Sequence, residues 1–557
     1  MKVKYHPPGR PAGPQDVDAP LPEWPQHILD RHRARILRPA EARRGTVDNL
    51  RSTAYRADVL LICQNALDTK WQDFSAVLDG TGMALQEPPE LDDIVTNSVL
   101  RERLSDSRLP RAVRLVEGGG EDPADAWVAL QLIRQQRPDL AGDVSLDHLM
   151  CGSVLGYGGV PTYDPNGVGH DAADGSPGSR YGLAPVTFSG APPHRSPDGA
   201  TRRPVIAVLD TGVRSHPWWG DVEVLEQPGT GGFLRLFKPA QDAIDAQHQH
   251  VAGLPDGDAL QTYIDAPIWQ AGLGEYLNYA SGHGSFIAGI IHQNAPDADV
   301  LSMRVMHSDG TSWESDVLLA LHLILALVTD AQAKHDDRPM VDIVSLSLGF
   351  YDESDGADST GGANITVTDG KVVRLAEVIG ELTDQGVLVV AAAGNDTTTR
   401  PFLPAAFATL PTGSAGHGEP VLGVGALNPN GTTAWFSNGG PSATWYAPGA
   451  RIVSAFPPDI RGAGAPGRIG SDNDRQGLDP DDFSGGFAVW DGTSFAAPHI
   501  AAALAREIET EIKAGNTDAG KRASEAVRRL KQIARTQAEA EANARPEAGL
   551  HTREPDE

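Results

Sequence analysis

Short apolar runs in the second half of the chain constrain the fold most. They are rich in Val and Ile and read PVIAVLD, VDIVSLSLG, GVLVVAAAGN and PVLGVGAL. Continuous apolar runs of this length are typical of strands that are covered on both faces. Helical segments are expected between them, near residues 281–293, 315–333 and 372–385. This alternation predicts a three-layer α/β domain around a central, mostly parallel sheet.

Polar residues whose side chains could take part in catalysis lie at the ends of these elements. Asp210 closes the first apolar run, and Asn395 follows Gly394 at the end of the third. His283 lies between two glycines at the start of an expected helix, and Ser494 opens another in DGTSFAAPHIAAA. Each has an ordinary explanation alone, as a turn former, a packing residue or a helix cap. Together they supply a nucleophile, a base, an orienting carboxylate and an oxyanion donor.

These segments resemble the motifs of the subtilisin-like serine proteases, or subtilases. VLDTGV is similar to the aspartate motif of that family, GHGSFIAGII to the histidine motif and GTSFAAPHIAA to the serine motif. AAAGN is similar to the segment with the oxyanion-hole asparagine. The resemblance runs from about residue 204 to 504, and it implies a subtilisin-like fold and peptide-bond hydrolysis.

The resemblance also implies roles for particular residues. The triad would be Asp210, His283 and Ser494, with Asn395 and the Ser494 backbone N–H in the oxyanion hole. Substrate would pair as an extra strand with Ser347, Leu348 and Gly349. An uncharged primary pocket would be walled by Leu348, Ala391, Ala392, Ala393 and Gly394.

Two motifs depart from the usual family pattern. Phe495 stands where the family usually has Met, and Ser285-Phe286 stands where Thr-His is usual. These residues flank the triad, so the departures bear on substrate fit more than on the chemistry.

Composition changes along the chain predict five segments. They are a Pro/Arg-rich segment 1–54, a small α/β domain 55–150, a Gly/Pro-rich linker 151–203, a catalytic domain 204–535 and a charged tail 536–557. The 55–150 unit has the size and place of a subtilase prodomain, although no specific motif distinguishes it from a recruitment domain. The linker is long enough to let it reach the cleft, so intramolecular inhibition is one expectation and recruitment the other.

Charge and cysteine content restrict the partners and the compartment. The formal net charge of −28 argues against general nucleic-acid binding, and two cysteines form neither a disulfide framework nor a metal cluster. The start of the chain does not resemble a secretion signal, and no run of about 18 apolar residues is evident. These features predict a cytoplasmic protein that does not bind membranes. No metal site is predicted, although calcium is left open, and HQH at residues 248–250 has no evident third ligand.

Three functional readings follow from the sequence. The leading one is a regulated intracellular serine endopeptidase acting on protein or peptide substrates. The second is a catalytically silent or blocked module of the same fold that holds peptides. The third is an enzyme kept inactive until a partner or a nick releases it. The sequence does not identify the substrate.

Overall fold

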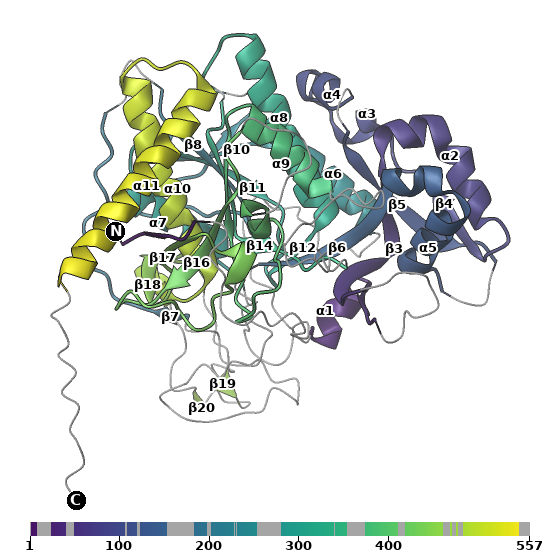
Figure 1. The fold of residues 1–557 in the computed structure, drawn as a ribbon, viewed down its shortest axis with the longest axis horizontal. Coiled ribbons are helices and arrows are strands. Elements are labelled where there is room, and N and C mark those ends of the chain that lie inside the picture. The colour runs from purple at the N-terminus through teal and green to yellow at the C-terminus, as the bar shows by residue number, and fades with distance from the viewer. Residues whose placement is uncertain are drawn as a thin grey trace, which may run out of the picture.

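The computed structural model places two sheets beside each other (Figure 1). The residues that it describes are 2–7, 24–39, 50–105, 108–119, 123–152, 183–197, 202–227, 229, 231–252, 280–338, 340–353, 374–409, 418–460, 468–469, 475–476 and 483–544. Most of the predicted linker and the end of the predicted tail lie outside these residues.

The larger sheet has nine strands and confirms the predicted parallel architecture. Its order is β1 (Lys4–Tyr5), β17 (Trp445–Pro448), β16 (Leu422–Leu427), β15 (Leu388–Ala392), β13 (Ile343–Leu346), β8 (Val205–Asp210), β11 (Asp299–Arg304), β10 (Leu234–Phe237) and β9 (Glu223–Leu225). Every neighbouring pair is parallel except β1 with β17. The four apolar runs therefore form β8, β13, β15 and β16 in the middle of this sheet.

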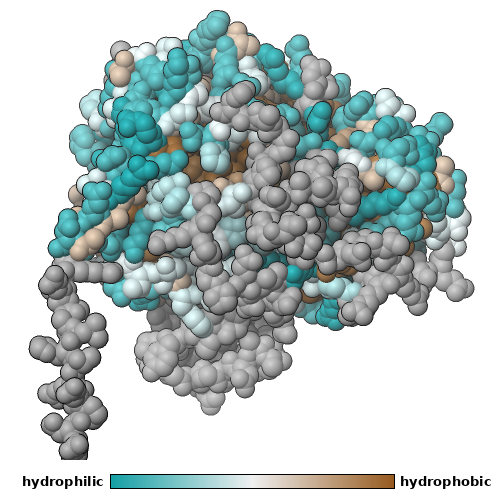
Figure 2. All heavy atoms as spheres, in the orientation of Figure 1, coloured by the Kyte–Doolittle hydropathy of each residue, from teal (hydrophilic) through white to brown (hydrophobic). Residues whose placement is uncertain are grey.

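Helices cover both faces of the nine-stranded sheet. One layer contains α7 (His283–Asn294), α10 (Thr493–Lys513) and α11 (Ala519–Ala544), and the other contains α6 (Lys238–Ala252), α8 (Glu314–Ala333) and α9 (Arg374–Asp384). Strand β8 shows why an apolar run is needed, because Ile206 and Val208 face the first layer while Ala207 and Leu209 face the second. The exposed side of α11 in Figure 2 is mostly hydrophilic.

Helix α8 agrees with the helix expected near residues 315–333 and begins one residue earlier. By length and composition it could cross a membrane, but 78% of its apolar window is buried inside the protein. It packs against α6, α9 and the N-terminal sheet. Its apolar surface is therefore explained by burial between the two sheets, as expected for a core helix.

The N-terminal region contains an antiparallel sheet with helices on both sides. Its strands are β2 (Ala34–Leu37), β3 (Thr53–Cys63), β4 (Met83–Gln86), β5 (Pro110–Glu117) and β6 (Val144–Gly152), and its helices are α1 (Gln26–Arg31), α2 (Gln64–Leu78), α3 (Leu91–Ile94), α4 (Ser98–Ser105) and α5 (Ala126–Gln136). The Asp125 side chain caps α5, accepting from the Trp127 N–H at 2.9 Å. The region begins before residue 55, because α1 and β2 belong with it.

The two regions share one hydrophobic core. In β3, Leu60 and Ile62 pack with α2 and α5, whereas Val59 and Leu61 belong to the same apolar cluster as α8. Strand β6 then continues out of the N-terminal sheet and pairs antiparallel with β12 (Thr311–Trp313) on one side and β14 (Leu348–Gly349) on the other. A strand from the N-terminal region therefore ends between two strands of the region that contains the nine-stranded sheet.

Shorter elements complete the described structure. They are β7 (Ala184–Pro185), β18 (Ile452–Ala455), β21 (Phe487–Trp490), the pair β19 (Arg468–Ile469) and β20 (Arg475–Gln476), and the 3₁₀ turns Pro138–Asp143, Ala405–Ala408, Gly440–Ser442 and Phe483–Gly485. At the two ends of the chain, α11 continues to Ala544, into the segment predicted as a tail, and β1 adds the first residues to the sheet edge.

Candidate active site

A buried carboxylate and imidazole meet at the end of β8. Asp210 is the last residue of this strand, and His283 is the first residue of α7. Their closest atoms, Asp210 Oδ1 and His283 Nδ1, are 2.7 Å apart, and both side chains are buried. Because the carboxylate accepts, Nδ1 carries the proton and Nε2 is the basic atom of the ring. Among the described residues, none hydrogen-bonds to this Nε2.

The glycine after His283 allows this close approach. A Cβ at Gly284 would lie 2.2 Å from the Gly212 carbonyl oxygen and 3.3 Å from Asp210 Oδ1. The start of α7 therefore packs directly on the turn that follows β8. The Thr211 N–H also donates to Asp210 Oδ1 at 2.8 Å, so the carboxylate is oriented from two directions.

Ser494 lies in the first turn of α10, as the sequence predicts. Its hydroxyl donates to the Ser347 carbonyl oxygen at 3.3 Å, and the Ser347 hydroxyl donates to the Ser494 carbonyl oxygen at 3.1 Å. The next side chain, Phe495, packs on the His283 ring with centroids 5.3 Å apart. The start of α10 thus lies beside the imidazole, and the Ser494 hydroxyl is hydrogen-bonded to the Ser347 carbonyl instead of to His283.

Pro498 is the sixth residue of α10. Proline lacks the N–H that would otherwise bond to the carbonyl four residues earlier, which is that of Ser494. The Ser347 hydroxyl takes the place of that N–H. The proline therefore frees a carbonyl that ties α10 to the segment after β13.

Asn395 follows β15 and contacts the same helix start. Its Oδ1 accepts from the Thr493 N–H at 2.9 Å and from the Thr493 hydroxyl at 2.8 Å. With Oδ1 occupied, the NH₂ group is the part of the amide left to donate to another group. The turn itself is held by Asn438, whose Nδ2 donates to the Ala393 carbonyl at 2.9 Å. Sequence reasoning singled out neither Thr493 nor Asn438, because a Thr before the Ser and a distant Asn carry no separate signal.

The residues expected to bind substrate lie beside β6. Gly349 pairs with Cys151, and Leu348 pairs with Gly152. On the other side of β6, Thr311 pairs with Cys151, and the Gly152 N–H donates to the Gly310 carbonyl at 2.7 Å. The sequence did not predict that β12 would pair with β6 on this side, because only a short polar run precedes the apolar helix there. The other expected pocket residues, Ala391, Ala392, Ala393 and Gly394, are buried at the end of β15 and in the turn after it.

A buried carboxyl group that the sequence reading did not single out follows Asn395. Asp396 Oδ2 accepts from the Tyr351 hydroxyl at 2.6 Å. Burial raises the pKa of Asp396 to about 6. Burial, with a smaller contribution from Asp396, also raises the pKa of the Cys151 thiol. The end of β6 is therefore next to a group that can change charge.

The HQH segment does not form a site of its own. His248 is buried and its Nδ1 lies 2.6 Å from Asp316 Oδ2, whereas His250 is exposed. Two histidines that differ in this way on one helix do not converge on one ion.

Comparison with known proteins agrees with the motifs and the sheet. The model of the subtilase family matches residues 201–549, which is more than half of the chain. Similar proteins include an intracellular serine protease of Paenibacillus polymyxa, 26% identical over 236 residues (40% of this chain and 53% of that protein). The minor extracellular protease Epr of Bacillus subtilis is 26% identical over 235 residues (40% and 26%).

Subtilisin BL of Lederbergia lenta is 25% identical over 300 residues (54% of this chain and 74% of that protein). A solved structure, that of the patellamide maturation protease PatA, has 21% identity and a TM-score of 0.31, covering 58% of this chain and 84% of that chain. That superposition is too loose to add to the description of the fold. The chain spans about a quarter to a half of the length of the first two relatives. From the family match and the motifs together, the chain belongs to the subtilase family of serine peptidases.

Proposed function

We propose that this protein is a serine endopeptidase that uses Asp210, His283 and Ser494 as its catalytic triad. The observation that carries the proposal is the buried Asp210–His283 pair, which leaves a basic Nε2 beside the start of α10. In the reaction, the Ser494 hydroxyl turns from the Ser347 carbonyl toward His283 and gives up its proton as it attacks the peptide carbonyl. Asp210 keeps the ring in the required tautomer and stabilises the imidazolium.

The oxyanion would be held by Asn395 and the Ser494 backbone N–H. Support comes from the contacts of Asn395 with Thr493, which hold the amide next to the first turn of α10. Helix N-termini favour negative charge through their free N–H groups. The substrate would lie as an extended strand between β12 and β14 and would be a protein or peptide.

The N-terminal region would act as an intramolecular inhibitor. Strand β6 occupies the space between β12 and β14, where a substrate strand would pair. An attached segment competes at high effective concentration, so it blocks the cleft without tight intrinsic affinity. This supports inhibition over recruitment for the predicted 55–150 unit.

A phosphonate probe that reacts only with an activated serine tests the triad. We expect the full-length protein to be labelled slowly, and the Ser494→Ala variant to fold normally with neither labelling nor peptide hydrolysis. Retained hydrolysis in purified Ser494→Ala would contradict the assignment. A wild-type protein that stays unlabelled even after limited nicking would favour the silent peptide-binding module.

A substitution in β6 tests the inhibition separately. Cys151 is paired on both sides, so Cys151→Pro removes an N–H from a central strand and should expel the strand end. We expect faster probe labelling and hydrolysis in Cys151→Pro, whereas Cys151→Ser should behave like the wild type. Equal rates in all three proteins, with melting still cooperative, would exclude an inhibitory role for β6.

A further inference from the structure

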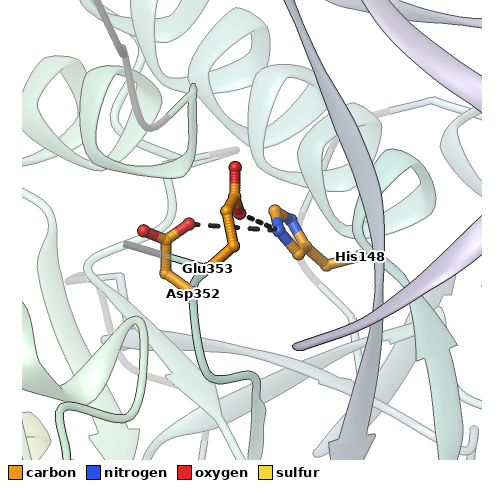
Figure 3. Close-up of side chains that lie close together, drawn as sticks. All are labelled: His148, Asp352 and Glu353. Atoms are coloured by element: carbon orange, nitrogen blue, oxygen red, sulfur yellow. Dashed lines mark hydrogen bonds and ion pairs between the residues drawn. The ribbon is translucent and has the colours of Figure 1, made fainter. Parts of the chain in front are cut away.

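A histidine of the N-terminal region is held between two glutamates of the catalytic region. His148 lies in β6, four residues before its end, and Figure 3 shows its ring facing Asp352 and Glu353. Its Nε2 lies 2.9 Å from Glu353 Oε2, and its Nδ1 lies 2.6 Å from Glu314 Oε2. Only 6% of the His148 side chain is exposed, with 4% for Glu314 and 5% for Glu353. The cluster is therefore almost free of water.

These two contacts determine the charge of the ring. A neutral imidazole has one N–H, so it can donate to one carboxylate but would face the other with a lone pair. With both glutamates ionised, the two short contacts are satisfied together only by the imidazolium, which donates from both nitrogens. Burial alone would lower the pKa of His148, but Glu314 and Glu353 together raise it well above its ordinary value. The Phe350 ring, stacked at 4.3 Å between centroids, adds a favourable surface for a cation.

Further charges around the ring come from several elements. Asp352 Oδ1 is 3.9 Å from Nε2, and Arg134 of α5 lies 3.8 Å from Glu353 Oε1. Tyr55 of β3 lies directly opposite His148 in the pairing of β3 with β6. Other polar or charged groups nearby are Asp147 on β6, Arg56 on β3, Asp316 on α8, and Arg400, which donates to the Asp352 carbonyl. Asp147 is paired with Arg56 at 3.2 Å, and the Tyr55 hydroxyl donates to Asp125, so both are engaged away from His148.

The charge balance near the ring favours a cation at His148. The carboxylates of Glu314, Asp352 and Glu353 lie around the ring, and the Arg134 guanidinium lies 3.8 Å from Glu353. A neutral ring would leave the buried Glu314 and Glu353 carboxylates without a positive charge between them, which is costly. Asp352 is the carboxylate of the three with most access to water.

A metal ion is the competing explanation, because His148, Asp352 and Glu353 place three donor atoms within 4.8 Å of one another. Metal binding needs the Nε2 lone pair, which the imidazolium does not have. Glu353 is also shared with Arg134, which would repel a cation. The observed contacts therefore fit a proton better than a metal, and the experiment below separates them.

We propose that His148 is a pH-dependent latch that holds β6 in the substrate cleft and loosens at alkaline pH. The proposal rests on the inhibitory role of β6 given above, whose regulation it specifies. The latch lies at the right place, since His148 is three residues before Cys151, where β6 enters between β12 and β14. It joins β6 to the first residue of α8 and to the segment after β14.

The direction of the pH effect follows from linkage. When β6 leaves the cleft, His148 meets water and titrates near its ordinary value of about 6.5. When β6 is in place, the ring keeps its proton to a higher pH. The charged contacts therefore stabilise the closed state fully below about pH 6.5 and are lost as the pH rises through the raised pKa.

Hydrogen exchange of the full-length Ser494→Ala protein tests the latch without any catalysis. We expect the peptide covering Val144–Gly152 to exchange about tenfold faster at pH 9.5 than at pH 6.5, after correction for intrinsic rates. A tenfold change corresponds to a difference of one unit between the His148 pKa in the closed state and that in the open state. His148→Gln in the same protein should exchange at the faster level at both pH values. His250→Gln, which removes an exposed histidine, should behave like the parent.

Three results would overturn the latch. One is a β6 peptide equally protected at both pH values, and another is the same pH dependence in His148→Gln. The third is a zinc-induced, EDTA-reversible gain of protection that needs His148, which would make the cluster a metal site. None of these outcomes depends on peptidase activity, so failure of the latch and failure of the proposed function are distinguishable.

Discussion

Ser347 and Ser494 exchange hydrogen bonds, the hydroxyl of each donating to the carbonyl oxygen of the other. The two distances are 3.1 and 3.3 Å. One bond satisfies the Ser494 carbonyl that Pro498 leaves free. The other holds the Ser494 hydroxyl, the candidate nucleophile, against the segment that is expected to pair with substrate. The pair therefore links the stability of α10 to the position of the reacting hydroxyl.

Removing the Ser347 hydroxyl should lower stability measurably. Ser347→Ala leaves the buried Ser494 carbonyl without that donor, which typically costs about 1–3 kcal/mol. We expect a lower urea midpoint. Ser345→Ala in β13, two residues before Ser347, is the matched control. The Ser345 hydroxyl is buried with no hydrogen-bond partner among the described residues. A midpoint that falls equally in both variants would contradict the role assigned to Ser347.

Replacing Asp210 by Asn should remove most of the catalytic rate. The amide no longer fixes Nδ1–H, so His283 can adopt the wrong tautomer, and the loss of kcat should be about 10⁴ with little change in KM. Asp316→Asn is the control, since Asp316 makes a similar buried contact with His248 at 2.6 Å. We expect kcat in that variant to change by less than tenfold. A near-normal kcat in Asp210→Asn would mean that another carboxylate orients the base.

Removing the Asn395 amide should slow the chemical step. We expect Asn395→Ala to lower kcat by about 10² to 10³ while KM stays near its original value, the usual effect of losing one oxyanion-hole donor. Thr493→Val breaks one of the two bonds that hold Asn395 but keeps the amide, so its loss should be much smaller. If Asn395→Ala raised KM and left kcat intact, the residue would bind substrate in the ground state.

Buried histidines should make the protein sensitive to acid. Burial lowers the pKa of His322, in α8, to about 4. Its folded-state pKa is below the unfolded value of about 6.5, so the unfolded chain takes up a proton that the folded chain refuses. The free energy of unfolding should then fall as the pH falls from about 6.5 to 4. Melting curves of His322→Leu should show a weaker loss over this range than those of the exposed control His27→Leu. Equal slopes in the two variants would contradict this explanation.

The catalytic region could be predicted from sequence because its signals are local. The strand ends at Asp210 and Asn395 and the helix starts at His283 and Ser494 are each visible within a few residues, and the parallel sheet brings them to one edge. The turn at Asn395 and the helix start at Thr493 meet as the motifs suggested. The sequence also predicted the alternation of strands and helices correctly.

Long-range contacts could not be predicted in the same way. The pairing of β6 with β12 joins residues about 160 positions apart, and nothing in VSLDHLM indicates its partners. His148 has no unusual neighbours in the sequence, and its two glutamates come from separate elements. The two hydrogen bonds between Ser347 and Ser494 likewise depend on how α10 packs, and a sequence motif gives no information on that packing.

The first residues of the chain add a consequence for any cut made after β6. Strand β1 pairs with β17 at the far edge of the catalytic sheet, the Val3 N–H donates to Gln537 Oε1, and Lys2 pairs with Glu541. A nick beyond Gly152 would thus create a two-chain protein. Its smaller piece would remain bound to the larger one through β1 at one end and β6 at the other. Its two pieces would migrate together under native conditions and separate only in denaturant, so the nicked protein would be a heterodimer made from one gene product.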